Sequence, residues 1–261
     1  MKRAQYLALL AAIAVFLTLY LGFSTIPPAQ KMTERSRALK GESTSFQALL
    51  GDAKAHLTGG AAEALLALEQ KENAATADSS RINALKALSA WWYDQGKPLV
   101  AGGYAEQVAE LEQSDAAWSV AGATFYHALS GEQDPTLRAY AGTHAVKAFE
   151  SAISLAPEQV EHRVNLALVY AENPPPDKPM QAVLMLRELE SKHPDNAAVY
   201  NALGRLAIKT NQWTRAVERL EKAWALDNTN PNTPCLLAKA YEGAGQTDKA
   251  VVFAKRCQSG Q

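Results

Sequence analysis

The sequence predicts an all-α protein in which helical hairpins form a solenoid behind one N-terminal transmembrane helix. Two stripes of apolar and small residues with a helical period lie close together in residues 197–230 and predict one hairpin. Related stripes recur along the chain at intervals of 34 to 37 residues, which is typical of a repeat architecture. Residues 6–23 carry no charge and are long enough to cross a bilayer.

The segment 197–230 reads as two helices joined by a short turn. The two stripes contain the following residues, the first at i, i+3, i+4 and i+7: Tyr200, Leu203, Gly204 and Ala207, then Ala216, Leu220 and Ala223. Residues 210–212 interrupt the pattern, and a connection this short makes neighbouring helices antiparallel. Gly204 and Ala216 are both small, so we expect the two backbones to approach closely there.

The same positions recur in the neighbouring segments. Equivalent small, aromatic and proline positions repeat at 34 or 37 residues: Ala182, Ala216 and Ala250; Ala167, Gly204 and Ala238; Tyr170, Ala207 and Tyr241; Pro157 and Pro194. A hairpin of this size cannot bury both of its faces alone. We therefore expect successive hairpins to stack on one another.

These residues resemble the tetratricopeptide repeat (TPR) family, whose unit places aromatic, glycine, alanine and proline residues at such intervals. The resemblance covers residues 82–257 and implies a right-handed α-solenoid. It divides this part of the chain into a degenerate repeat, a repeat with an insertion between its helices, a repeat with a proline-rich loop and two further repeats: residues 82–114, 115–159, 160–196, 197–230 and 231–261.

The repeat at 115–159 departs from the family in the spacing of its two helices. Its first-helix and second-helix positions are Trp118, Gly122 and Phe125, then Ala145 and Phe149. Gly122 and Ala145 lie 23 residues apart instead of 12, and the eleven extra residues make about three helical turns. We therefore expect a longer second helix that starts at Asp134-Pro135, a good pair for an N-cap and a first turn.

The N-terminal region is predicted to anchor the chain in a membrane. Residues 1–5 form a short tail and residues 6–23 the transmembrane helix, with a cleaved signal peptide as the alternative. Lys2 and Arg3 adjoin the span, which favours a cytoplasmic N-terminus. The soluble domain is then expected in the periplasm, at a bacterial inner membrane.

Residues 24–81 are predicted to be a juxtamembrane helical spacer. Helices are expected near 46–57 and 61–71, separated by a break at two consecutive glycines. A further degenerate repeat is the alternative interpretation of this segment.

The composition and motifs argue against nucleic-acid binding and against catalysis. The net charge is −1, and the five histidines form no metal-ligand spacing. Neither a phosphate loop nor a nucleophile elbow occurs, so no enzyme activity, metal or cofactor is predicted. Cys235 and Cys257 are 22 residues apart, which fits neither a redox pair nor a zinc site. Two small core residues are favoured, and a disulfide outside the cytoplasm is the alternative.

In TPR proteins the first helices of the repeats line a concave groove that takes partner segments, so the resemblance implies a binding site there. The positions beside the core stripe give the candidate groove residues: Tyr93, Tyr126, Val164, Leu168, Asn201, Arg205 and Lys239. The early part of this set is aromatic and apolar, whereas the later part offers amide and cationic donors suited to an acidic segment. An ordinary solvated helix face is the alternative.

The function predicted from these features is that of a membrane-tethered scaffold that binds a protein or peptide segment. The arrangement is also similar to the TPR components of bacterial c-type cytochrome maturation, which implies a partner such as an unfolded apocytochrome segment. A structural spacer or assembly factor is the third hypothesis. In that case self-association would use the C-terminal end, where Val251 and Phe253 are expected to be exposed.

Overall fold

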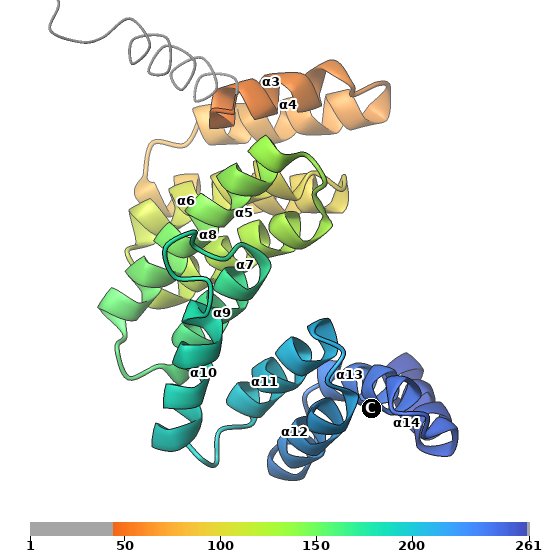
Figure 1. Ribbon diagram of the computed structural model, residues 1–261. Helices are drawn as coiled ribbons and strands as arrows, with labels where there is room; N and C mark the ends of the chain where they lie inside the picture. Colours follow the sequence, from red (N-terminus) through yellow and green to blue (C-terminus); the bar gives the residue numbers. More distant parts are fainter. Residues whose placement is uncertain (1–43, 260–261) are drawn as a thin grey trace, which may run out of the picture. The chain divides into compact units, whose positions relative to one another are not determined.

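The computed structural model describes residues 44–259, and its secondary structure consists of α-helices (Figure 1). The chain divides into two compact units, residues 1–48 and 49–261. The predicted tail at 1–5 and transmembrane segment at 6–23 lie outside the described residues. Among residues 44–259, no helix is both long enough and apolar enough to cross a membrane.

Twelve helices lie in the described part of the chain. Their bounds are α3 (Phe46–Ala55), α4 (Gly60–Asn73), α5 (Asp78–Asp94), α6 (Pro98–Glu112), α7 (Asp115–Gly131), α8 (Pro135–Leu155), α9 (Val160–Glu172), α10 (Gln181–Lys192), α11 (Ala197–Lys209), α12 (Trp213–Leu226), α13 (Asn232–Gly243) and α14 (Thr247–Ser259). From α5 onward they pack as consecutive pairs, and the first helices α7, α9, α11 and α13 also contact one another in series. Helix α5 begins four residues before the expected start at Ile82, with Asp78 in its first turn, where a carboxylate is favourable.

The hydrophobic core consists of clusters that each join neighbouring hairpins. One cluster packs around Phe125 and Phe149 between α7, α8 and α9. The next includes Leu186 of α10 with residues of α9 and α11, and another packs around Leu220 between α11, α12 and α13. Because each cluster draws only on adjacent helices, the fold is held together by contacts between successive hairpins, as in solenoids.

Most of the predicted repeat-core residues lie in these clusters or at close contacts between helices. The buried ones are Gly122, Phe125, Ala145, Phe149, Ala167, Ala182, Gly204, Ala216, Leu220 and Tyr241. Trp118, Tyr170, Leu203, Ala238 and Ala250 are half-buried. Ala238 lies beside the buried stripe of α13, which runs through Pro234, Leu237 and Tyr241. Pro157 and Pro194 are exposed, since they stand in connections between helices.

Glycines mark the closest helix contacts within two hairpins. A Cβ added to Gly204 of α11 would lie 2.5 Å from Cγ of Leu220 on α12. A Cβ added to Gly122 of α7 would lie 2.9 Å from the ring of Phe149 on α8. The glycine of the first helix therefore receives a large side chain of the second. The expected partner of Gly204 was Ala216, and the side chain that fills this space is that of Leu220.

The long helix α8 begins where the sequence predicts. Asp134 is its N-cap, and its Oδ1 accepts hydrogen bonds from the backbone N–H groups of Thr136 (2.8 Å) and Leu137 (3.0 Å). The N–H group of Leu137, followed by that of Thr136, lowers the pKa of Asp134 because both stabilise the ionised carboxylate. These bonds satisfy donors that the first turn of a helix would leave unpaired.

Arg138, in the first turn of α8, joins the ends of two first helices. Its Nη1 donates to the carbonyl oxygens of Leu129 (2.7 Å) and Glu132 (3.0 Å) at the end of α7. Its Nη2 donates to the carbonyl oxygen of Glu172, the last residue of α9, at 3.3 Å. A cation is favourable at the C-terminal end of a helix, where backbone carbonyls lack helical partners. One side chain thereby links the repeat with the insertion to the repeat with the proline-rich loop.

Candidate binding groove

Four first helices line one concavity of about 310 Å³, which we call the cationic groove. Its lining residues are Tyr126 of α7; Leu168, Ala171 and Glu172 of α9; Arg205, Leu206, Ile208 and Lys209 of α11; and Leu236 and Lys239 of α13. Four of the seven predicted groove residues are brought together here: Tyr126, Leu168, Arg205 and Lys239.

The charged groups of the cationic groove are unequally paired. Lys209 Nζ lies 2.8 Å from Glu172 Oε2 and donates to the carbonyl oxygen of Ala171 at 2.6 Å. The guanidinium of Arg205 instead lies 5.9 Å from the centre of the Tyr126 ring, which is within range of a cation–π interaction. In residues 44–259, no carboxylate forms an ion pair with Arg205 or Lys239. The groove therefore holds three cations and one carboxylate, which Lys209 already pairs.

Burial changes the pKa of Tyr126, the aromatic residue of this groove. It raises the pKa of the Tyr126 phenol, and the nearby Arg205 guanidinium partly opposes that rise. The Tyr126 hydroxyl thus stays protonated and neutral at physiological pH. The groove thus combines an aromatic face, aliphatic walls and fixed positive charge.

Two predicted groove residues face the core instead. Val164 is only 3% exposed and packs in the apolar cluster between α9, α10 and α11. Asn201 is 8% exposed, and its Oδ1 accepts a hydrogen bond from the buried hydroxyl of Thr233 at 3.1 Å. Asn201 therefore joins α11 to α13 and does not offer its side chain to the groove. The reason is that successive first helices pack on one another along a strip beside the groove.

Sequence reasoning missed Lys209 and Leu236 of the cationic groove. Lys209 stands four residues after Arg205, and this spacing places two side chains on the same helix face. That signal was present in the sequence. Leu236 is not among the candidate positions beside the core stripe, and its side chain supplies part of the apolar wall.

Tyr93 lies in a different place from the cationic groove. It lines an apolar groove of about 510 Å³ between α5, α6 and α7. The other lining residues are Lys86, Ser89, Ala90, Asp94, Ala105, Val108, Glu112, Ala116, Ala117, Val120 and Thr124. Lys86 forms an ion pair with Glu112 across its rim, and Val120 is 59% exposed. The early repeats thus present an apolar surface whose rim lysine is already paired.

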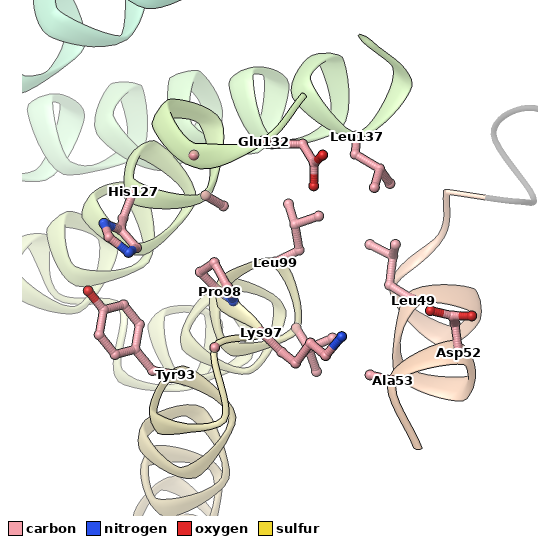
Figure 2. A pocket seen from close by; sticks show the side chains of 14 residues that line it. Leu49, Asp52, Ala53, Tyr93, Lys97, Pro98, Leu99, His127, Glu132 and Leu137 are labelled. Carbon is pink, nitrogen blue, oxygen red and sulfur yellow. The ribbon is translucent and has the colours of Figure 1, made fainter. Parts of the chain in front are cut away.

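Tyr93 also borders a third cavity, of about 420 Å³, at the ends of several helices (Figure 2). Leu49 of α3, Leu99 of α6 and Leu137 of α8 lie around it. The Tyr93 ring faces His127 of α7 at 5.3 Å between ring centres. The residue pattern could not predict this cavity, because it forms where connections between helices meet and not along a periodic stripe.

Cys235 of α13 and Cys257 of α14 form a disulfide, with their Cα atoms 4.8 Å apart. The favoured prediction of two separate small core residues is therefore wrong, because the two cysteines are bonded to each other. Both cysteines are half-buried. They meet because α13 and α14 pack as a pair that brings the start of one helix beside the end of the other.

No protein-family model and no curated protein matches the sequence. Among solved structures, the chain is similar to TTC0263, a thermophilic TPR protein of Thermus thermophilus, with a TM-score of 0.51 and 18% identity over 68% of this chain and 90% of that chain. More distant similarities include MamA from Desulfovibrio magneticus RS-1, with a TM-score of 0.39 and 16% identity over 69% of this chain and 92% of that chain. Another is YrrB, a TPR protein with an unusual peptide-binding site. Its TM-score is 0.37, and the identity is 13% over 78% of this chain and 93% of that chain. The similarity to TTC0263 confirms the predicted fold, an α-solenoid of TPR-like helical hairpins.

Proposed function

We propose that this protein is a binding scaffold whose cationic groove takes an extended acidic segment of a partner protein. The observation that carries the proposal is the placement of Arg205 and Lys239. They come from consecutive first helices, line the same concavity and form no ion pair with a carboxylate in residues 44–259. Charge-assisted hydrogen bonds to a carboxylate are among the stronger polar contacts, and guanidinium groups bind carboxylates with two donors.

The walls of the groove support a peptide ligand over a small anion. Leu168, Leu206 and Leu236 line the concavity beside the cations. An apolar wall with a few fixed polar groups is typical of a site that binds an organic side chain and orients its charge. A segment that alternates acidic and aliphatic side chains would satisfy both features.

Fluorescence anisotropy with a fluorescein-labelled hexaglutamate peptide tests this proposal. The Arg205→Glu/Lys239→Glu double variant removes two attractive charges and adds two repulsive ones. Each charged contact contributes about 1.5 to 3 kcal/mol, so affinity should fall a hundredfold or more.

The matched control is the Lys71→Glu/Arg187→Glu double variant. It makes the same change in net charge at two exposed positions outside the groove. It should leave affinity nearly unchanged. Equal binding by the groove variant and wild type would contradict the proposal, as would equal loss in both variants.

We also propose that the scaffold is tethered by residues 6–23 to a bacterial inner membrane, with its helices in the periplasm. The disulfide supports a location outside the cytoplasm, because reducing systems in the cytosol keep thiols reduced. A phosphatase active only outside the cytoplasm, fused to the C-terminus, should be active. A fusion that is stably expressed but has no phosphatase activity would refute this orientation.

Two narrower hypotheses concern the partner. The resemblance to cytochrome maturation components suggests an apocytochrome segment, and crosslinking in native membranes should then capture haem-maturation proteins. Phe253, which was expected to be exposed, is half-buried against Trp224 and Tyr241. The exposure of Val251 (49%) and Val252 (52%) on α14 still favours self-association at the C-terminal hairpin. Light scattering, which measures the molar mass in solution, tests the second hypothesis. A monomer at high protein concentration would contradict self-association.

A further inference from the structure

The Cys235–Cys257 disulfide lies beside the cationic groove. Cys235 immediately precedes Leu236, which lines the groove, and stands four residues before Lys239 on α13. Residues four apart occupy the same side of a helix. The bond therefore attaches α14 close to the part of α13 that presents Leu236 and Lys239 to a ligand.

Helix α14 buries little of its own surface. None of its residues from 247 to 258 is buried, whereas α13 buries residues along its whole length. Its aromatic contacts come from Phe253, whose ring centre lies 5.8 Å from that of Trp224 and 5.5 Å from that of Tyr241. Elements with few buried contacts open at low free-energy cost. The disulfide adds a covalent constraint to these contacts and holds α14 against α13.

We propose that this disulfide is a redox-sensitive clasp that sets the affinity of the cationic groove. The proposal rests on the proposed function, since it names the regulation of that same site. When the clasp is closed, α14 supports α13, and Leu236 and Lys239 are held in the groove. When it is open, α14 separates from α13, and these two groove residues lose their fixed position.

The reductant is a protein dithiol. One of its thiolates attacks a sulfur of the Cys235–Cys257 bond and forms a mixed disulfide, because both cysteines are only half-buried. Its second thiolate then displaces that bond. Two electrons and two protons pass in total, leaving two cysteine thiols on this chain and one disulfide on the reductant.

The test compares the oxidised and reduced full-length chain in detergent micelles, with the hexaglutamate probe. The sequence contains only two cysteines, so dithiothreitol acts at a single bond. We expect reduction to weaken probe binding at least fivefold. We also expect amide hydrogen exchange in α14 and around residues 236–239 to accelerate at least tenfold, while exchange in α7 and α8 stays the same.

The Cys235→Ser/Cys257→Ser variant is the matched control, and it should bind like the reduced chain whether or not dithiothreitol is present. An unchanged affinity on reduction overturns the proposal even if α14 exchanges faster. If the oxidised chain does not bind the probe at all, the proposed function fails. Equal hydrogen exchange in the two redox states would then separately overturn the clasp.

Discussion

At Gly204 the backbone of α11 leaves no space for a methyl group. An added Cβ would lie 2.5 Å from Cγ of Leu220, and Leu220 is itself fully buried, so it cannot swing into solvent. Gly204→Ala should therefore lower the free energy of unfolding by about 1 to 2 kcal/mol, because overpacking outweighs the gain in helix propensity. Urea denaturation of the purified chain measures this change.

Gly51 in α3 provides the matched control for that substitution. A Cβ added there meets no atom within 4 Å. Gly51→Ala should be neutral or stabilise the chain by about 0.5 to 1 kcal/mol, since alanine costs less conformational entropy in a helix. Similar effects of the two substitutions would mean that α11 and α12 do not meet at Gly204.

Glu106 is a buried carboxylate that links α6 to α8. Its Oε2 lies 2.7 Å from His144 Nδ1, and its Oε1 accepts a hydrogen bond from Lys147 Nζ at 2.6 Å. Burial alone would raise the pKa of Glu106, but the bonds from His144 and Lys147 outweigh it and hold the pKa below its usual value of 4.5. Glu106→Gln should cost about 1 to 3 kcal/mol near neutral pH.

The sign of the pH dependence follows from the lowered pKa of Glu106. The folded state binds the proton more weakly than the unfolded state, so this stabilisation is present above the usual carboxyl pKa and is lost as pH falls through the lowered value. Melting temperatures of wild type and Glu106→Gln should therefore converge below about pH 4. Glu110→Gln, one turn away at an exposed carboxylate, should differ little from wild type at any pH.

At the scale of single residues, the sequence predicted positions on a helix better than the direction of a polar side chain. Arg205 and Lys239 reach a shared concavity, as expected of cations beside a core stripe. Asn201 belongs to the same face of α11, but its amide is buried against Thr233. Periodicity places a residue on a face. Only the packing of the next first helix decides whether that part of the face is a groove or a contact.

Among the elements, α8 shows how an insertion is accommodated in the array. It extends over 21 residues, and Arg138 in its first turn donates hydrogen bonds to the ends of α7 and α9. Arg138→Met removes these donors but keeps an aliphatic stem. It should lower the free energy of unfolding by about 1 to 3 kcal/mol, because partly buried carbonyls lose charged partners.

Arg187 of α10 is the matched control for Arg138, since it is exposed on a helix surface. Arg187→Met should change the free energy of unfolding by less than about 0.5 kcal/mol. Thermal melts followed by circular dichroism compare the two variants. Equal melting temperatures for both would show that the Arg138 bridge does not stabilise the junction of α7, α8 and α9.

The elements themselves were largely predictable, for reasons that differ along the chain. Asp134-Pro135 marks the start of α8, because a capping carboxylate followed by proline is a strong local signal. The Cys235–Cys257 bond has no such signal, since it depends on how α13 and α14 pack and on the redox state of the compartment. The hydrophobic period of the helices likewise does not predict how the connections between them are arranged. The cavity beside Tyr93 and His127 was therefore not predicted.

For the whole molecule, a net charge of −1 implies that no long-range field draws an acidic partner toward the groove. Attraction in the cationic groove then comes from Arg205 and Lys239, which form no ion pair with a carboxylate in residues 44–259. Raising the salt concentration from about 0.05 to 0.5 M should therefore speed dissociation of the hexaglutamate probe while changing its association rate little. Stopped-flow kinetics measures both rates, and a large fall in the association rate alone would contradict a purely local attraction.

The bond between α13 and α14 also determines how the chain carries mechanical load. When its two ends are pulled apart, tension that reaches Cys235 passes through the sulfur atoms to Cys257 and bypasses the residues between them. The two cysteines are 22 residues apart in the sequence, so about 70 to 80 Å of contour length stays hidden in an optical-trap extension until a reductant is added. A scaffold anchored at one end and loaded at the other would thus transmit force without unravelling its last hairpin.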